Sequence, residues 1–171
     1  MQIFIETPRL ILREMSQVDA EGMFIMDSDP EVHKYLGNRP VKDMDTIKTV
    51  INFVRQQYIS NGIGRWSVID KESGQFMGWA GFKLNTEPCN GYINYIDIGY
   101  RLQRQHWGKG IATECSQACM QYGLSELKYN QIFAAAHIDN VASNRILKKI
   151  GLAYKNQFTH DNELCNWYAL K

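Results

Sequence analysis

The chain has 171 residues, of which 44% are hydrophobic and 22% are charged, and this length and composition are typical of one globular domain. Its 19 lysines and arginines nearly cancel its 18 aspartates and glutamates, so the net charge of +1 argues against a protein that coats nucleic acid. No apolar run approaches the ~20 residues of a transmembrane helix, and the N-terminus lacks the basic lead of a secretion signal, so we expect a cytoplasmic protein without membrane contacts.

The hydrophobic pattern predicts strands and helices along the whole chain. In chain order, we expect a strand over residues 3–13, a short helix from a capping signal at 16–19 to 26, a helical turn over 32–35, a long helix from Asp43 or Asp45 to 61, strands over 65–70, 75–83 and 92–102, a helix over 111–124, a strand over 131–137, a helix over 142–150, and a closing hairpin of 153–158 and 163–170. No repeat or linker divides this series, so we expect a single domain over residues 1–171. The strand–loop–helix units in its middle indicate an α+β or α/β domain around one mixed sheet.

The long helix carries the clearest helical signal. Its apolar residues recur at helical spacing and form one stripe, made of Ile47, Val50, Ile51, Val54 and Tyr58. Gly62 follows the last residue of the helix and takes the left-handed conformation that other residues avoid. We therefore expect the helix to end at this glycine.

A glycine-containing loop lies between the strand over 92–102 and the helix over 111–124, and it reads Gln105-x-x-Gly108-Lys109-Gly110. The first N–H groups of a helix have no intrahelical partner, and the helix dipole places about half a positive charge beside them. Glycines let the backbone approach a bulky anion, so we expect a phosphate or pyrophosphate ligand. The loop matches neither a P-loop nor a dinucleotide-binding fingerprint. The alternative interpretation is a plain turn that starts a helix.

Three segments resemble a known family. Residues 105–112 are similar to the pyrophosphate loop of GNAT N-acetyltransferases, written Q/R-x-x-G-x-G/A. The opening ETPRLILRE at 6–14 and the segment NVASNRILKKIGL at 140–152 resemble the RimJ/RimL-type branch, which acts on ribosomal proteins. The three segments span nearly the whole chain in the order of that branch, so the chain resembles a RimJ/RimL-type acetyltransferase.

The resemblance implies an α+β fold with a mostly antiparallel mixed sheet and about four flanking helices. The sheet would splay between its fourth and fifth strands, over 92–102 and 131–137, with acetyl-CoA in the gap. The backbone of the fourth strand would pair with the pantetheine arm, the loop would hold the pyrophosphate, and two residues of the 140–152 segment would contact the cofactor. The residues so implied are Ile98, Gly99, Tyr100, Gln105, His106, Trp107, Gly108, Lys109, Gly110, Ile111, Asn140 and Lys149. For Lys149, the alternative is a solvated charge on a helix surface.

Acetyl transfer to an amine needs a base, because an ammonium group has no lone pair for attack. Members of the branch often carry a carboxylate just before the fourth-strand segment, and Asp97 stands there. Partial burial among apolar neighbours would raise the pKa of Asp97 and make it a better proton acceptor. His137, at the end of the fifth strand, competes for this role because its ordinary pKa lies near ~6.5. Either residue has a structural alternative, as a satisfied polar residue or a packed histidine at a strand end.

The leaving thiolate needs a proton or a strong hydrogen-bond donor. Many GNAT enzymes have a tyrosine seven residues beyond the position of Asn140, but Leu147 stands there in this chain. Proteins resembling this branch are thought to use a serine instead, which here is Ser143. The alternative is that Ser143 caps its helix.

The sequence therefore predicts an N-acetyltransferase that uses acetyl-CoA directly and transfers acetyl to a primary amine. By resemblance, the first expectation for the acceptor is a protein N-terminus; a small-molecule amine is the alternative, and a catalytically silent acetyl-CoA-binding module is another. The four cysteines form no metal-binding pattern, so we expect no metal. We expect no nucleic-acid partner. Proteins of this family are often homodimers, so a homodimer is one expectation for the assembly.

Overall fold

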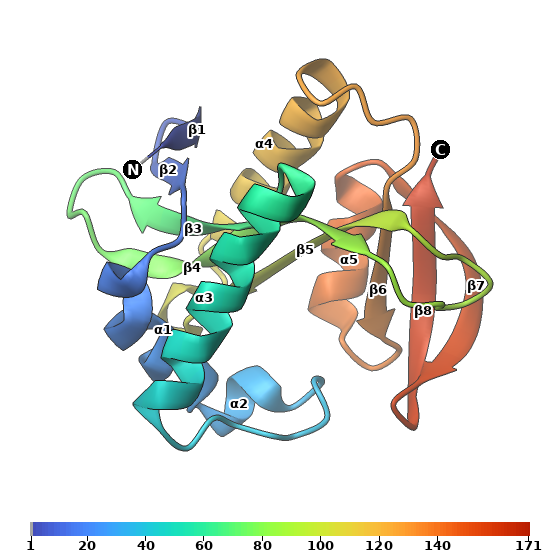
Figure 1. The fold of residues 1–171 in the computed structure, drawn as a ribbon. Helices are drawn as coiled ribbons and strands as arrows, with labels where there is room; N and C mark the ends of the chain where they lie inside the picture. Colours follow the sequence, from blue (N-terminus) through green and yellow to red (C-terminus); the bar gives the residue numbers. More distant parts are fainter. Residues whose placement is uncertain (1) are drawn as a thin grey trace.

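The computed structural model describes residues 2–171, so Met1, the first residue of the predicted domain, lies outside the described residues. Its centre is an eight-stranded sheet in the order β1-β2-β3-β4-β5-β6-β8-β7 (Figure 1). The strands are β1 (Ile3–Glu6), β2 (Leu10–Arg13), β3 (Arg65–Asp70), β4 (Phe76–Asn85), β5 (Tyr95–Leu102), β6 (Phe133–His137), β7 (Leu152–His160) and β8 (Glu163–Leu170). β5 and β6 run parallel, whereas the other neighbouring strands are antiparallel.

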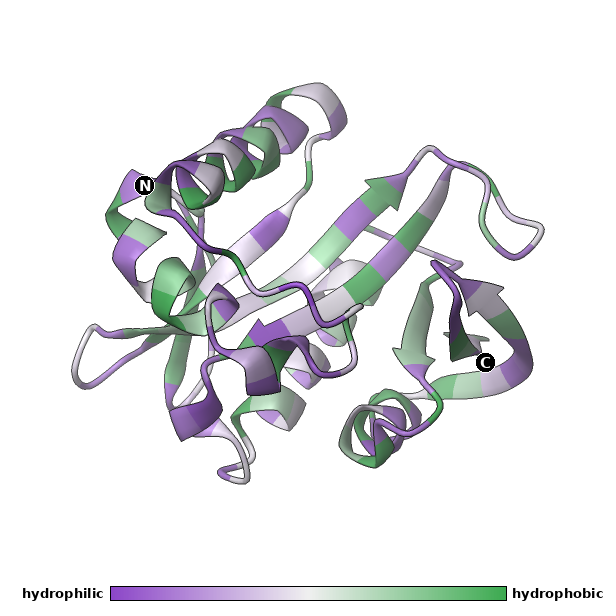
Figure 2. Cartoon of the chain, turned by 90° about the horizontal axis from the view of Figure 1, so that it is seen from below, coloured by the Kyte–Doolittle hydropathy of each residue, from purple (hydrophilic) through white to green (hydrophobic). Residues whose placement is uncertain are grey.

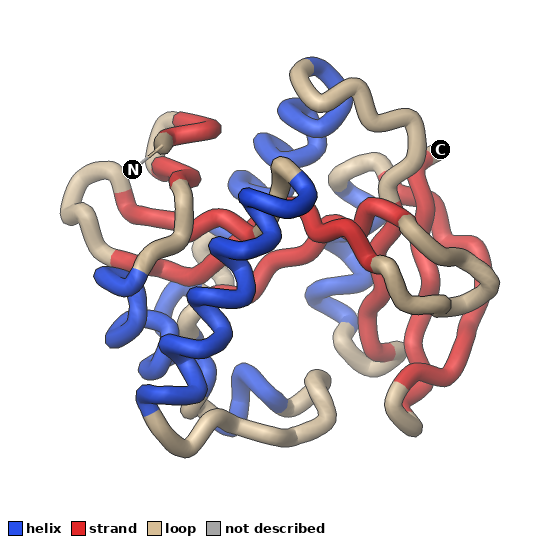
Figure 3. Tube along the Cα trace, in the orientation of Figure 1, coloured by secondary structure: helices blue, strands red, loops and turns tan. Residues whose placement is uncertain are grey.

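Helices cover both faces of this sheet (Figures 1 and 3). They are α1 (Ala20–Asp27), α2 (Pro30–His33), α3 (Met44–Asn61), α4 (Ile111–Ser125) and α5 (Val141–Lys149). α1 and α3 pack together on one face, while α4 and α5 bury apolar side chains against the other face. The predicted mixed α/β fold with a mostly antiparallel sheet is thus confirmed. Among the described residues the flanking helices number five, because the short α2 forms a separate element. It begins where the Asp29 carboxylate accepts a hydrogen bond from the Glu31 N–H at 2.9 Å.

The predicted single strand over residues 3–13 is wrong, because the chain turns back on itself between β1 and β2. The hydroxyl oxygen of Thr7 accepts a hydrogen bond from the Leu10 N–H at 2.9 Å, and the Thr7 N–H donates to the Leu10 carbonyl at 2.9 Å. Two short antiparallel strands therefore replace one long strand. The strands predicted as fourth and fifth become β5 and β6, and β5 begins at Tyr95 because Tyr92 forms an isolated bridge with Cys89.

α3 forms where the sequence predicts a long helix. The Asp43 carboxylate caps its first turn by accepting a hydrogen bond from the Thr46 N–H at 2.8 Å. Gly62 ends the helix with a φ of 70°, as expected. Val50 was predicted to belong to the buried apolar stripe, and this is wrong, since Val50 is 38% exposed. The stripe is therefore narrower than the spacing suggests.

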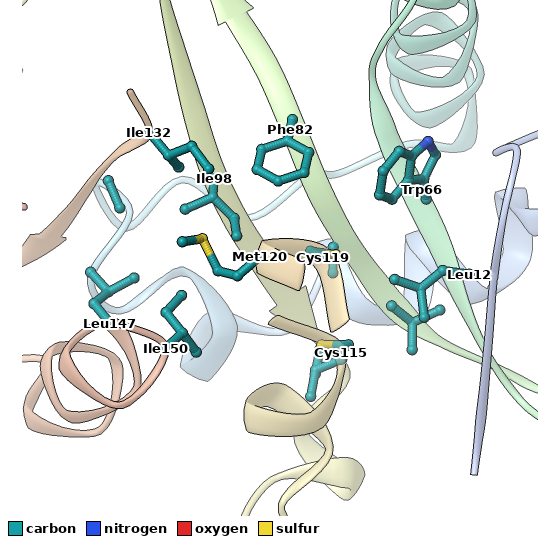
Figure 4. Close-up of a cluster of buried hydrophobic side chains, with 14 of the residues drawn as sticks. Leu12, Trp66, Phe82, Ile98, Cys115, Cys119, Met120, Ile132, Leu147 and Ile150 are labelled. Carbon is teal, nitrogen blue, oxygen red and sulfur yellow. The ribbon is translucent and has the colours of Figure 1, made fainter. Parts of the chain in front are cut away.

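The main core lies between the sheet and the helices α4 and α5 (Figure 4). Its labelled members come from β2, β3, β4, β5, α4, the segment before β6, and α5, and are Leu12, Trp66, Phe82, Ile98, Cys115, Cys119, Met120, Ile132, Leu147 and Ile150. Figure 2 shows hydrophobic and hydrophilic residues alternating along the strands. This alternation leaves one face of β5 for the core and the other for the face that α3 covers.

The sheet opens between β5 and β6, as the family resemblance implies. The two strands are in register at one pair, Asp97 with Phe133, and they diverge beyond it (Figures 1 and 2). The backbone of β5 from Ile98 onward is therefore paired with β4 on one side alone. Ala135 in the middle of β6 is exposed, which fits an opening beside this strand. The loop between β4 and β5 crosses to β7, where the Asn90 and Asn156 side-chain amides exchange two hydrogen bonds of 3.1 Å.

Candidate active site

A cleft of about 890 Å³ lies on the α3 face of the sheet where β5 and β6 part. Residues of α3, of every strand from β3 to β8 and of the loop between β4 and β5 line it. Four residues predicted from the sequence meet in its wall, namely Asp97, Ile98, Gly99 and Tyr100. The cleft therefore reaches the strand whose backbone is expected to pair with the pantetheine arm.

Asp97, the favoured base, forms an ion pair with Arg65 on the floor of the cleft. The carboxylate is 19% exposed, and the same guanidinium donates to the Asp97 carbonyl at 3.1 Å. Gly99 makes room for this arrangement, because a Cβ there would lie 2.9 Å from Nη2 of Arg65. Burial raises the pKa of Asp97, and the Arg65 charge opposes this rise. The Asp97 carboxylate thus reaches the cleft, and the Arg65 charge limits how far burial raises its pKa.

Sequence reasoning missed Arg65 and its neighbours, which continue the charged floor. The guanidinium carbons of Arg65 and Arg101 lie 5.2 and 5.3 Å from the ring centre of Trp79. Arg101 in turn donates to the buried carboxylate of Asp27 at 2.8 Å. Each arginine on the floor is therefore paired with its own carboxylate. The alternation of β3, β4 and β5 places Arg65, Trp79 and Arg101 on one face, but the sequence gives no signal of which acid each arginine meets.

His137, the competing base, lies at the end of β6 and does not line the cleft. Both of its ring nitrogens have partners. Nδ1 accepts a hydrogen bond from the Asp139 N–H at 3.1 Å, so Nε2 carries the proton and donates to the Glu163 carboxylate at 2.9 Å. Tyr35 of the segment after α2 packs 5.4 Å from the ring. This environment fits a packed strand-end histidine better than a base that faces the acceptor.

The glycine loop opens α4 in the predicted way. Gly108 and Gly110 have φ values of 72° and 78°, in the left-handed region that favours glycine. The first hydrogen bond inside the helix runs from the Glu114 N–H to the Gly110 carbonyl at 3.0 Å, so the N–H groups of the preceding residues have no intrahelical partner. A Cβ at Gly108 would meet no atom within 4 Å. The N–H groups of His106 and Trp107 donate to the Gln103 and Arg104 carbonyls at 3.0 Å, so the bare amides begin at Gly108. From there the loop offers free N–H groups, the positive end of a helix dipole and space, which fits a diphosphate.

The side chains of the loop are anchored on the protein. The indole N–H of Trp107 donates to the Leu102 carbonyl at 3.0 Å, while 45% of the residue stays exposed. The Gln105 amide donates to Gln103 at 2.9 Å. Burial lowers the pKa of His106, and the Lys109 charge lowers it further, so the His106 ring is neutral at pH 7. Among the side chains of residues 105–110, Lys109 therefore carries the positive charge, and the helix dipole adds to it.

Asn140 and Ser143 lie at the start of α5, on the other side of the opening. The Asn140 side chain accepts a hydrogen bond from the Ser143 N–H at 3.1 Å, so Asn140 is the N-cap and the Ser143 hydroxyl is free of that role. The Ser143 hydroxyl opposes the rise that burial causes in the pKa of the Tyr100 phenol from β5, so the two groups are neighbours. Leu147, which replaces the usual tyrosine, is 2% exposed and belongs to the core. Lys149 is exposed in the last turn of α5, and its contact with the cofactor stays a prediction.

Comparison with known proteins decides the family. Residues 9–153 match the family model described as an acetyltransferase (GNAT) domain. The chain is a GNAT acetyltransferase. It is 35% identical over 144 residues, 84% of this chain and 79% of the relative, to an uncharacterized N-acetyltransferase, p20, from Bacillus licheniformis. The name of this relative states no acceptor, so the match supports the family and leaves the acceptor open.

Two solved structures share the fold of this GNAT acetyltransferase. RimL, the ribosomal L7/L12 α-N-protein acetyltransferase in complex with coenzyme A, aligns with a TM-score of 0.81 at 17% identity and covers 98% of this chain and 97% of its own. Spermidine N-acetyltransferase from Vibrio cholerae, in complex with coenzyme A and spermine, aligns with a TM-score of 0.76 at 14% identity, over 96% of both chains. The two proteins acetylate different amines, so the shared fold alone does not select the acceptor.

That Ser143, with Tyr100 beside it, supplies this GNAT acetyltransferase with a hydroxyl donor in place of the missing tyrosine stays a prediction. Burial raises the pKa of Tyr100 to about 12, so its phenol stays protonated at neutral pH and is able to donate. We expect Tyr100→Phe and Ser143→Ala each to lower kcat about tenfold, as the loss of one hydrogen bond to a developing charge predicts, with little change in the KM for acetyl-CoA. Steady-state kinetics of both variants and of the double variant test this pair. Additive losses in the double variant would contradict a joint role of the two hydroxyls.

Within residues 2–171, no group of three or more His, Cys, Asp or Glu side chains is arranged to hold a metal ion. No helix among the described residues of this GNAT acetyltransferase is long and apolar enough to cross a membrane.

Proposed function

We propose that this GNAT acetyltransferase, acting as one domain over residues 1–171, transfers acetyl directly from acetyl-CoA to the α-amine of a protein N-terminus. The observation that carries the proposal is the opening between β5 and β6. It exposes one side of β5, the strand that carries Asp97 in the wall of the cleft and ends just before the loop with the bare amides of α4. An edge strand without a partner is a known docking site for an extended chain, which the pantetheine arm is expected to mimic.

The lining of the cleft favours an acceptor with few charges. Among the described residues that line it, the carboxylates are Glu87 and Asp97, and Asp97 is already paired with Arg65. A polycationic amine would need more negative charge than this cleft offers. α3, the end of β4 and the loop that follows it instead supply neutral hydrogen-bonding side chains, namely Gln56, Gln57, Ser60, Asn61, Asn85 and Thr86. Such groups suit the peptide N–H and C=O groups that follow an N-terminal amine.

The test is an amine screen with free-thiol detection, run with acetyl-CoA and the full chain. The panel contains peptides with ribosomal-protein N-termini, the same peptides with a blocked α-amine, free amino acids, polyamines and aminoglycosides. The proposal predicts turnover with the free peptides and none with the blocked ones. Turnover with polyamines or amino acids alone would assign a small-molecule acceptor. Tight acetyl-CoA binding without transfer to any amine would instead assign a binding module.

A further inference from the structure

The turn between β1 and β2 is built around a carboxylate of α4. Glu114, in the first turn of that helix, accepts hydrogen bonds from the Thr7 hydroxyl at 2.6 Å and from the Arg9 N–H at 3.2 Å. The Arg9 guanidinium adds two contacts to the same carboxylate, through Nε at 2.7 Å and Nη2 at 2.6 Å. Residues more than 100 positions apart in the chain are thus joined at the helix terminus that is expected to bind the anion.

Arg9 also holds the glycine loop itself. Its Nη1 donates to the Lys109 carbonyl at 3.0 Å, and its Nη2 lies 3.4 Å from where a Cβ of Gly110 would stand. In a trans peptide, the carbonyl of one residue and the N–H of the next point in opposite directions. A Lys109 carbonyl held by Arg9 therefore turns the Gly110 N–H away from Arg9, toward the opposite side of the loop.

The ion pair between Arg9 and Glu114 also determines the charge at the start of α4. Burial opposes ionisation of Glu114, but hydrogen bonds from Thr7 and Arg9 outweigh it and hold the pKa of this carboxyl below its ordinary value. An ionised glutamate in the first turn of α4 would repel a diphosphate bound at the same terminus. The Arg9 guanidinium neutralises that charge while leaving the amides of the loop free. The arginine is half exposed, so it is positioned at the rim of the loop.

We propose that Arg9 is a positioning residue for the diphosphate-binding loop: it aims the Gly110 amide at the ligand and cancels the charge of Glu114. The proposal rests on the proposed use of acetyl-CoA. The resemblance at 6–14 identifies the segment as a family feature, whereas its role at the loop follows from the contacts above. A second carrier separates the two claims, because acetyl-pantetheine bears the thioester without the diphosphate.

The experiment measures CoA affinity by calorimetry and kcat/KM for both thioesters in Arg9→Gln. We expect the Kd for CoA to rise about tenfold or more, with kcat/KM for acetyl-CoA falling equally, as loss of charge-assisted hydrogen bonds predicts. For acetyl-pantetheine, kcat/KM should change less than about twofold, because no diphosphate is present. Lys71→Gln is the matched control, since Lys71 pairs with Glu6 at 2.8 Å on the same turn without touching the loop.

Two further variants test the two roles of Arg9. In Arg9→Gln/Glu114→Gln, removal of the uncompensated carboxylate should recover part of the CoA affinity, and Arg9→Lys should lie between wild type and Arg9→Gln. An unchanged Kd for CoA in Arg9→Gln, or an equal fall in kcat/KM for both thioesters, would overturn the proposal. A wild-type enzyme that does not prefer acetyl-CoA to acetyl-pantetheine would refute the proposed function instead.

Discussion

Gly108→Glu is expected to abolish CoA binding while the fold stays intact. A Cβ at Gly108 meets no atom within 4 Å, so the new side chain starts in open space beside the amides where the diphosphate is expected. The new carboxylate would face a ligand of the same sign at a few ångströms, which raises the Kd by about 100-fold or more. The φ of 72° adds backbone strain of about 1–2 kcal/mol, which most folds of this size tolerate. Calorimetry with CoA and a thermal melt measure the two effects separately.

Gly62→Glu is the matched control for this prediction. Gly62 has nearly the same backbone conformation, with a φ of 70°, and a Cβ there also meets no atom within 4 Å. It ends α3, so it lies outside the loop that opens α4. The control should show the same loss in Tm and a CoA affinity within about twofold of wild type. Retained CoA affinity in Gly108→Glu would refute the assignment of the loop.

Asp97→Asn is expected to lower kcat by about 10²- to 10⁴-fold, the usual contribution of a general base. The amide occupies the same space beside Arg65 but cannot accept a proton from the amine. His137→Gln should lose far less, because the His137 ring is tied to Glu163 and to the Asp139 N–H outside the cleft. The reverse ranking of the two variants would assign the base to His137.

The pH dependence gives the same residue a second test. A base acts when deprotonated, so the rate falls as the pH drops through its pKa, and burial sets that pKa of Asp97 above its ordinary value of 3.8. Arg65→Met removes the charge that opposes this rise, so the acidic limb of kcat should move to higher pH. In Asp97→Asn the limb should vanish. The limb of the α-amine itself, near ~8, belongs to the acceptor and stays in every variant.

The fold could be predicted in large part because local rules and tertiary contacts agree along most of the chain. α3 is an example: a capping aspartate, an apolar stripe and a terminal glycine define it in sequence and in structure. The strand over 3–13 failed because Thr7 makes its turn with a side-chain hydrogen bond, which hydrophobic alternation does not reveal. The family resemblance implied that the sheet splays between β5 and β6, whereas the residues themselves gave no signal of it.

The candidate site, too, could be predicted from the sequence only in part. Gly108 and Gly110 made the loop recognisable in the sequence, because the positive φ values at this helix start favour glycine. The roles of Arg65 and Arg9 could not be predicted from local sequence, because their partners are distant in the chain. Arg65 pairs with Asp97, 32 positions away, and Arg9 pairs with Glu114, 105 positions away. The Tyr100–Ser143 pair joins a strand and a helix on either side of the opening, so sequence spacing does not relate them.

The most direct measurement is a crystal structure of the full chain with CoA. The diphosphate should accept hydrogen bonds from the backbone amides between Gly108 and Ile111, and the pantetheine arm should run along Ile98–Tyr100 toward Asp97. Density for the diphosphate at any other part of the surface, with the α4 terminus unoccupied at saturating CoA, would contradict the account.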